Sequence, residues 1–156
     1  MQRHSRPRLI ALLAVAASLA ACGPLGPFPG GKLRGSVHSG AAPDWSSARD
    51  AKQVQLETRP GDPYSVNVWC GVMDGKLYVP SSLILGTDDP AERGWVRNVL
   101  ADPRVRLRIE GTLYPLRAVR VEDPAELEAV RKLLLAKYHV DPDEHAAAAW
   151  IFRLDP

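Results

Sequence analysis

Residues 69–109 read WCGVMDGKLYVPSSLILGTDDPAERGWVRNVLADPRVRLRI, and this stretch decides the fold. Its Asp74-Gly75 pair favours a tight turn between antiparallel strands, and Leu77-Tyr78-Val79 continues as the second of those strands. Asp89-Pro90 is a helix start, and Asp102-Pro103 ends that helix. The order predicted for this stretch is therefore strand, turn, strand, loop, helix and strand.

The final strand of that stretch, Arg104 to Ile109, gives the clearest strand signal in the chain because apolar residues alternate with three arginines. Alternation at period two is typical of a strand with one buried face. We interpret the arginines as a solvated face in preference to a ligand-binding row. Glu110-Gly111 then turns the chain into a strand over 112–121, where Pro115 indicates an edge position or a bulge.

The strands upstream of this stretch are predicted from the same alternation. Gln53 to Thr58 forms one strand, a Pro-Gly-Asp-Pro turn follows at 60–63, and Tyr64 to Val72 forms the next strand. With Leu77-Tyr78-Val79 these strands predict a three-stranded antiparallel meander. Ile151 to Leu154 is a candidate closing strand.

Three helix starts share one pattern, Asp-Pro-x-Glu, at 89–92, 123–126 and 141–144. In each start the aspartate can cap free N–H groups, proline suits the first helical position, and glutamate favours the positive end of the helix dipole. The first helix is expected to bury Trp95, Val96, Val99 and Leu100, and the second Leu127, Val130, Leu134 and Tyr138. Helices inserted among five or six antiparallel strands predict a mainly β, α+β domain, a small antiparallel barrel.

An export signal precedes this domain. Residues 1–21 combine three arginines with a short apolar run, and Leu19-Ala20-Ala21-Cys22 resembles the lipobox of bacterial lipoproteins. We expect lipidation of Cys22, with an ordinary signal peptide and a chance cysteine as the alternative. Gly23, rather than aspartate, follows the cysteine, so the expected location is the periplasmic face of the outer membrane where two membranes are present.

Residues 22–35 are rich in proline and glycine and are predicted to be a tether, so the folded domain is expected over 36–156. Removing the signal takes three of the 20 basic residues and leaves 17 against 18 acidic residues. The sequence therefore offers no strongly basic surface for nucleic acid.

The sequence carries no recognisable catalytic or metal-binding constellation. With Cys22 lipidated, Cys70 has no disulfide partner, and its apolar strand predicts a buried, inert thiol. His38, His139 and His145 are scattered, and we interpret them as surface or capping residues rather than metal ligands. No catalytic residue can be assigned from the residues alone.

Several segments together carry a family resemblance. Trp69, the VMDGKLYV segment and Trp95 to Val105 resemble the pyridoxamine 5'-phosphate oxidase-like FMN-binding split β-barrel superfamily, especially its deazaflavin-dependent nitroreductase branch. The end of the second helix, Leu135-Ala136-Lys137-Tyr138, is similar to small members of the same group. The resemblance covers about Val54 to Tyr138 and implies a split β-barrel.

The resemblance also implies a homodimer with FMN or the deazaflavin F420 in a cleft between subunits. Ser81 and Ser82 would then contact the cofactor phosphate, with Arg93 or Arg97 supplying positive charge. The basic residue that oxidase members carry on the second strand has no counterpart over Tyr64 to Val68. This departure weakens the expectation of cofactor binding.

Arg93 and Arg97 are four residues apart, so they would repel each other on one helical face unless an anion lay between them. The alternative is that Arg93 pairs with Asp89 while Arg97 points into water. Two hypotheses for function follow: a membrane-anchored flavin- or deazaflavin-dependent oxidoreductase, or a cofactor-free split barrel that acts as a binding or structural module of the cell envelope.

Overall fold

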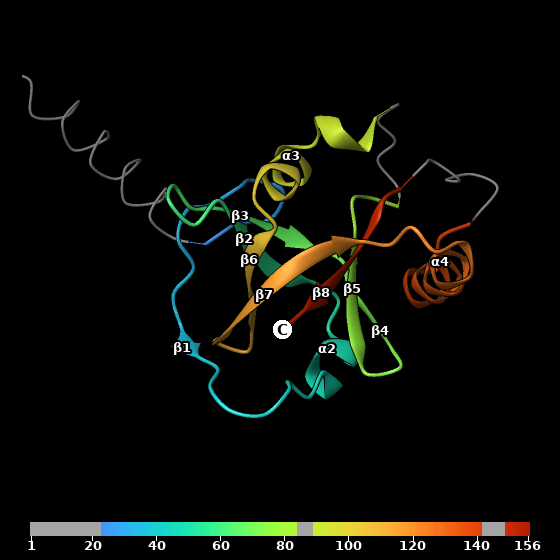
Figure 1. The fold of residues 1–156 in the computed structure, drawn as a ribbon, viewed down its shortest axis with the longest axis horizontal. Coiled ribbons are helices and arrows are strands. Elements are labelled where there is room, and N and C mark those ends of the chain that lie inside the picture. The colour runs from blue at the N-terminus through green and yellow to red at the C-terminus, as the bar shows by residue number, and fades with distance from the viewer. Residues whose placement is uncertain (1–22, 84–88, 142–148) are drawn as a thin grey trace, which may run out of the picture.

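The computed structural model describes residues 23–83, 89–141 and 149–156. Its elements are β1 (Ser36–Val37), α2 (Ser46–Asp50), β2 (Val54–Thr58), β3 (Tyr64–Val68), β4 (Gly71–Met73), β5 (Lys76–Pro80), the 3-10 turn η1 (Pro90–Glu92), α3 (Gly94–Ala101), β6 (Arg104–Ile109), β7 (Thr112–Arg120), α4 (Pro124–Tyr138) and β8 (Ile151–Asp155). One sheet runs in the order β3-β2-β6-β7-β8-β5-β4, with β1 paired in parallel to β7. This sheet curls into a half-barrel (Figure 1), which confirms the predicted small antiparallel split β-barrel of the α+β class.

Two separate hairpins stand where the sequence predicted a meander. β2 pairs with β3 and β4 pairs with β5, but β3 and β4 lie at opposite ends of the strand order. The predicted continuous strand from Tyr64 to Val72 is wrong because it breaks at Trp69 and Cys70. Apolar residues continue to alternate through Val68, Cys70 and Val72, so the two-residue period of the sequence gives no sign of this break.

The strands at the C-terminal end match their predictions. Ile151 to Leu154 lies within β8, between β7 and β5. Pro115 lies opposite Arg106 of β6, between the part of β7 that pairs with β1 and the part that pairs with β8. Its missing N–H therefore falls at a locally unpaired edge, as the proline predicts.

The main core fills the curl of the sheet. Leu56, Leu77 and Leu107 are fully buried there, and Trp95 of α3 meets Phe152 of β8 with ring centroids 5.4 Å apart. Val105, Leu107 and Ile109 are all buried, as the alternation of β6 predicts. This core fixes the positions of α3 and the β2–β3 hairpin.

The first predicted helix is divided at Arg93. Asp89 accepts a hydrogen bond from Ala91 N–H (2.8 Å) and starts η1, whereas α3 begins only at Gly94. Trp95, Val96 and Val99 are buried, but Leu100 is 53% exposed, so that part of the prediction is wrong. At 100° per residue, Leu100 lies about 90° around the helix from the middle of the buried face.

The second predicted helix is α4, and its start is capped as expected. The Asp123 side chain accepts a hydrogen bond from the Glu126 N–H (2.7 Å), and Pro124 holds the first position. Val130 and Leu134 are fully buried against a second cluster that includes Tyr78 and Ile151, so α4 covers one side of the sheet (Figure 1). The third predicted helix start, 141–144, lies outside the described residues except for Asp141.

The predicted tether contacts the barrel over part of its length. Gly30 and Ser65 of β3 exchange two backbone hydrogen bonds of 2.8 Å, and Leu33 is only 2% exposed. This segment covers Glu57 of β2, which pairs with Arg106. The prediction that the arginines of β6 face solvent is therefore wrong for Arg106, because the segment around Leu33 covers Glu57, with which Arg106 forms an ion pair.

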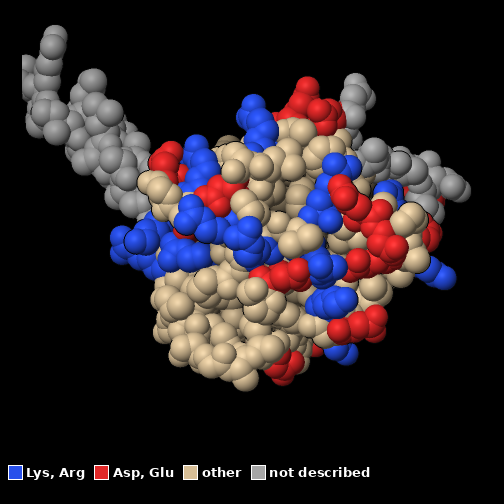
Figure 2. All heavy atoms as spheres, viewed as in Figure 1, with Lys and Arg blue, Asp and Glu red and all other residues tan. Residues whose placement is uncertain are grey.

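Charges of both signs are spread over the face seen in Figure 2. The region near β1, lower left in that view, shows few charged side chains, in keeping with the uncharged sequence GSVHSGAAP at 35–43. None of the described helices is long and apolar enough to cross a membrane.

Candidate functional site

A cavity of about 450 Å³ opens beside β3, where β5 has ended and α3 begins. Small-molecule sites commonly have volumes of roughly 300–1,000 Å³. Tyr64 and Asn67 of β3 form part of one wall, Ser81 and Ser82 follow β5 along a second, and the start of α3 closes a third. The cavity therefore combines aromatic surface with several polar groups.

Three of the four residues predicted from the sequence line this cavity. Ser81, Ser82 and Arg93 are brought together there, although Arg93 is distant from the serines in sequence. Arg97 is exposed one turn further along α3 and is not among the lining residues. Cofactor binding by these residues stays a prediction.

The two serines differ in how deeply they are buried. Ser81 is 7% exposed, and its Oγ accepts a hydrogen bond from the Trp150 N–H (3.1 Å). The Ser81 N–H in turn donates to the Trp150 carbonyl (2.7 Å), so this residue joins the end of β5 to the start of β8. Ser82 is partly exposed and is the better placed of the two to contact a ligand.

The start of α3 forms a polar wall of the cavity. Arg93 is the N-cap residue, and no described side chain caps the helix there. Gly94 lies close to Tyr64, so a Cβ at position 94 would be 3.2 Å from the Tyr64 Oη. The helix N-terminus, whose N–H groups and dipole favour anions, therefore lies at the cavity, which Arg93 also lines.

Sequence reasoning missed the contribution of β3 to this cavity. Tyr64, Asn67 and Trp69 line it, whereas the sequence predicts for this strand only a place in a meander and the lack of a basic cofactor contact. The signal in the sequence is that two aromatic residues, Tyr64 and Trp69, flank the amide of Asn67, since ligand sites are lined mostly by apolar and aromatic side chains with a few polar groups. Apart from the bridge between Gly30 and Ser65, no strand among the described residues pairs with the outer edge of β3.

The chain leaves β3 through Trp69 and Cys70, and the end of α4 holds this break in place. The Trp69 and Tyr138 rings stack with centroids 4.1 Å apart, and Cys70 N–H donates to Tyr138 Oη (2.9 Å). Lys137 Nζ donates to the Cys70 carbonyl (2.9 Å). The end of α4 thus fixes the position of Trp69 in the wall of the cavity.

The Cys70 thiol is fully buried, as the sequence predicts. Burial raises its pKa, although the nearby Lys137 charge acts in the opposite direction. A thiol with a raised pKa remains protonated near neutral pH and is a poor nucleophile. Cys70 therefore serves the packing behind the cavity, as expected.

A second, larger cavity of about 700 Å³ has four basic residues in its lining, Lys32, Arg104, Arg106 and Arg117. Two of its arginines are already paired within the chain, Arg104 with Asp102 and Arg106 with Glu57. None of the predicted cofactor-binding residues lines it. The cavity beside β3 is therefore the better candidate for a ligand site.

Across the residues that the structure describes, there is no group of three or more His, Cys, Asp or Glu side chains that could hold a metal ion.

Known proteins resemble the chain in sequence pattern and in fold. The model of the F420H(2)-dependent quinone reductase family matches residues 54–144. No curated protein matches the sequence.

Three solved structures show the fold. A structure described as an F420-H2 dependent reductase is 21% identical, with 67% of this chain and 94% of that chain covered and a TM-score of 0.52. One described as a domain-swapped dimer is 22% identical, covering 68% and 81%, with a TM-score of 0.56. A putative pyridoxamine 5'-phosphate oxidase from Listeria innocua is 17% identical, covering 71% and 88%, with a TM-score of 0.50.

Proposed function

Because the chain belongs to the F420H(2)-dependent quinone reductase family, we propose that it is a reductase that binds a deazaflavin or flavin cofactor in the cavity beside β3. Among these cofactors we favour F420, which the family description names. The observation that carries the proposal is the meeting of Ser82, Arg93 and the α3 N-terminus at one cavity.

The residues around the cavity fit a cofactor that has a ring system and a phosphate-bearing tail. Gly94 leaves space beside Tyr64 that a Cβ would reduce, and the uncapped start of α3 offers backbone N–H groups. Arg93 adds a guanidinium suited to phosphate oxygens. Tyr64 and Trp69 offer aromatic surface for the ring.

When bound, the reduced cofactor supplies the hydride for the acceptor, which the family description identifies as a quinone. The protein's own contribution is binding and orientation. Arg93 and the α3 N-terminus would hold the anionic end of the cofactor, while Trp69, stacked on Tyr138, would give its ring a fixed aromatic surface. A fixed surface limits the orientations that a planar ring can adopt.

The absence of lysine and arginine from Tyr64 to Val68 bears on the choice of cofactor. Oxidase-type relatives are expected to use a basic residue on this strand, whereas the cavity here receives its positive charge from α3. We therefore place the cofactor phosphate near Arg93 rather than against β3. FMN remains the second cofactor to test.

The test is a titration of the purified protein with F420 and with FMN, followed by visible absorbance. Arg93→Ala should weaken binding of the preferred cofactor at least tenfold, which is about 1.4 kcal/mol, because it removes the charge at the cavity. Arg97→Ala is the matched control on the same helix and should leave the affinity unchanged, since Arg97 does not line the cavity.

Two results would count against this proposal. If the Arg93→Ala and Arg97→Ala proteins bind the cofactor with equal affinity, the cofactor phosphate does not bind near Arg93. If neither cofactor binds the parent protein, the alternative function stands, namely a cofactor-free split barrel used as a binding or structural module of the cell envelope.

We further propose that the protein is a lipoprotein anchored through Cys22, on the periplasmic face of the outer membrane where two membranes are present. The support is the match of Leu19-Ala20-Ala21-Cys22 to a lipobox, followed by glycine. We also propose a homodimer. Its support is one structural relative described as a domain-swapped dimer, together with the cofactor cleft expected between subunits.

A further inference from the structure

The two most exposed large apolar side chains of the described chain lie in a single turn, since Leu25 is 73% exposed and Phe28 is 70% exposed. Their backbones exchange hydrogen bonds of 3.1 Å and 3.0 Å and so close the turn, with Gly26 and Pro27 at its tip. Both apolar side chains are therefore displayed by a hydrogen-bonded structure.

This turn is attached to the barrel beside the cavity. Asn67 Nδ2 of β3 donates to the Gly26 carbonyl (2.9 Å), and the Ser65 hydroxyl donates to the Gly31 carbonyl (2.7 Å). Gly26 and Pro27 also line the cavity. The turn and the cavity rim consequently keep one fixed relation to each other.

The chemistry of the surrounding segment indicates the partner. Leu25 is three residues after Cys22, the residue with the lipobox signal. Residues 23–35 contain Lys32 and Arg34, both exposed, and no acidic residue. A segment that carries exposed apolar side chains and positive charge, with no acidic residue, suits the boundary between acyl chains and anionic headgroups.

We propose that the turn Leu25–Phe28 is a membrane-docking element, which inserts Leu25 and Phe28 into the bilayer surface beside the lipid on Cys22. This inference rests on the lipid anchor proposed above. The lipid alone would hold this end of the protein at the membrane without bringing the turn into the bilayer. Docking through the turn fixes one orientation and brings the rim of the cavity to the bilayer surface.

The test uses the full lipidated protein in vesicles of phosphatidylcholine and phosphatidylglycerol. A polarity-sensitive fluorophore is attached at Leu25→Cys, where the exposed side chain tolerates substitution, and at Lys76→Cys as the control. Lys76 begins β5, next to the β4–β5 turn that lies on the far side of the barrel from the β2–β3 hairpin in Figure 1. Cys70 is fully buried and should not react.

We expect the label at position 25 to emit at shorter wavelength on vesicles and to be quenched by spin-labelled lipid at least threefold more than the label at position 76. Aqueous iodide should quench position 76 more strongly. Equal quenching of both positions by iodide, with the protein still sedimenting with vesicles, would overturn docking while leaving the anchor intact.

Two further outcomes distinguish a failure of membrane docking from a failure of the lipid anchor and from association of two copies. If the protein does not sediment with vesicles, and Cys22→Ser behaves in the same way, the anchor itself is wrong and the docking fails with it. A short-wavelength emission that depends on protein concentration and persists without vesicles would show that a second copy covers the turn, which also overturns the proposal. Cofactor titration is independent of all these results.

Discussion

Glu57 lies on a strand whose alternation predicts a solvent-facing side chain, yet it is only 3% exposed. The segment before β1 covers it, and the Leu33 N–H donates to its Oε2 (2.5 Å). Arg106 donates from Nε to Oε1 (2.8 Å) and from Nη2 to Oε2 (2.7 Å). Such a two-bond pair is among the stronger interactions of a carboxylate.

We expect Glu57→Gln to lower the free energy of unfolding by about 2 kcal/mol, because it leaves Arg106 without its counter-charge and weakens the bond from Leu33. Urea denaturation measures the effect. Asp102→Asn is the control, since the Asp102–Arg104 pair is largely exposed and should matter much less. Equal effects of the two changes would contradict a structural role for the buried pair.

At the scale of single residues, the sequence located the candidate site in part. Ser81, Ser82 and Arg93 line the cavity, and their contact with a cofactor phosphate stays a prediction. Helical spacing placed Arg97 beside Arg93, but Arg93 is an N-cap with extended backbone (ψ 129°), so the two do not share a regular helix. The contact that occupies Ser81 comes from Trp150, and no local pattern connects residues so far apart.

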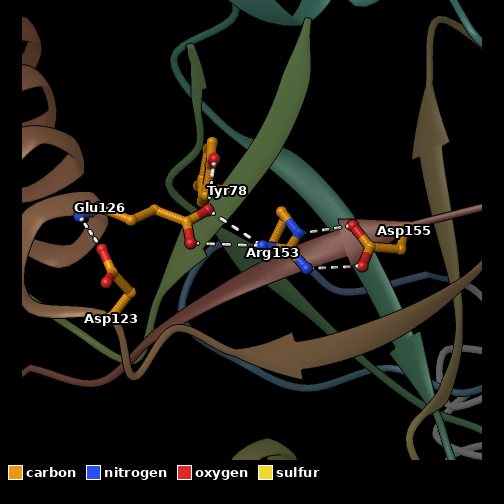
Figure 3. A network of polar contacts seen from close by, with 5 residues as sticks. All are labelled: Tyr78, Asp123, Glu126, Arg153 and Asp155. Atoms are coloured by element: carbon orange, nitrogen blue, oxygen red, sulfur yellow. Dashed lines mark hydrogen bonds and ion pairs between the residues drawn. The ribbon is translucent and has the colours of Figure 1, made fainter. Parts of the chain in front are cut away.

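Among the elements, α4 is fixed to the sheet by a polar cluster that Figure 3 shows from close by. Tyr78 of β5 donates from its hydroxyl to Glu126 Oε1 (2.8 Å), and Arg153 of β8 donates to the same oxygen (3.0 Å). Arg153 also binds Asp155 with two bonds, of 2.8 Å and 3.0 Å. One carboxylate on the first turn of α4 thus contacts two strands.

This cluster should make stability depend on acid pH. The hydrogen bond from Tyr78, followed by the contact with Arg153, lowers the pKa of Glu126. A carboxylate with a lowered pKa in the folded state stabilises the protein above its unfolded pKa, roughly 4.3, and this contribution is lost as pH falls through the folded pKa. We expect Glu126→Gln to lower the melting temperature at pH 7 and to flatten its decline below about pH 4.5.

Thermal denaturation between pH 3 and pH 7 provides the measurement. Glu128→Gln changes an exposed glutamate on the same helix and should leave the pH profile unchanged. If the Glu126→Gln and parent profiles are parallel across the acid range, the cluster does not carry the proposed acid sensitivity.

Elements with local signals were predictable, whereas the break between hairpins was not. The Asp-Pro starts at Asp89 and Asp123 are both capped as their spacing predicts. The break at Trp69 and Cys70 depends instead on Lys137 and Tyr138, which bind it from the end of α4. Lys137 and Tyr138 are far from Cys70 in the sequence, so the alternation of apolar residues in the strand does not indicate the break.

At the scale of the whole molecule, the strand order ends at β3 on one side and β4 on the other. Edge strands present unpaired N–H and C=O groups, which proteins usually cover. The N-terminal segment covers β3 only in part, through the Gly30–Ser65 pair. The cavity lies beside this incompletely covered edge, where a second subunit could complete it.

We therefore predict a two-fold symmetric homodimer in which the partner covers the part of the β3 edge that the N-terminal segment leaves open, with the Leu25–Phe28 turn outside the interface. Light scattering of the lipid-free Cys22→Ser protein should give twice the monomer mass at micromolar concentration. Added cofactor should shift any residual monomer toward dimer, because a ligand held between subunits stabilises the assembled state. A monomer mass up to millimolar concentration, with or without cofactor, would contradict the dimer and confine the ligand site to residues of one chain.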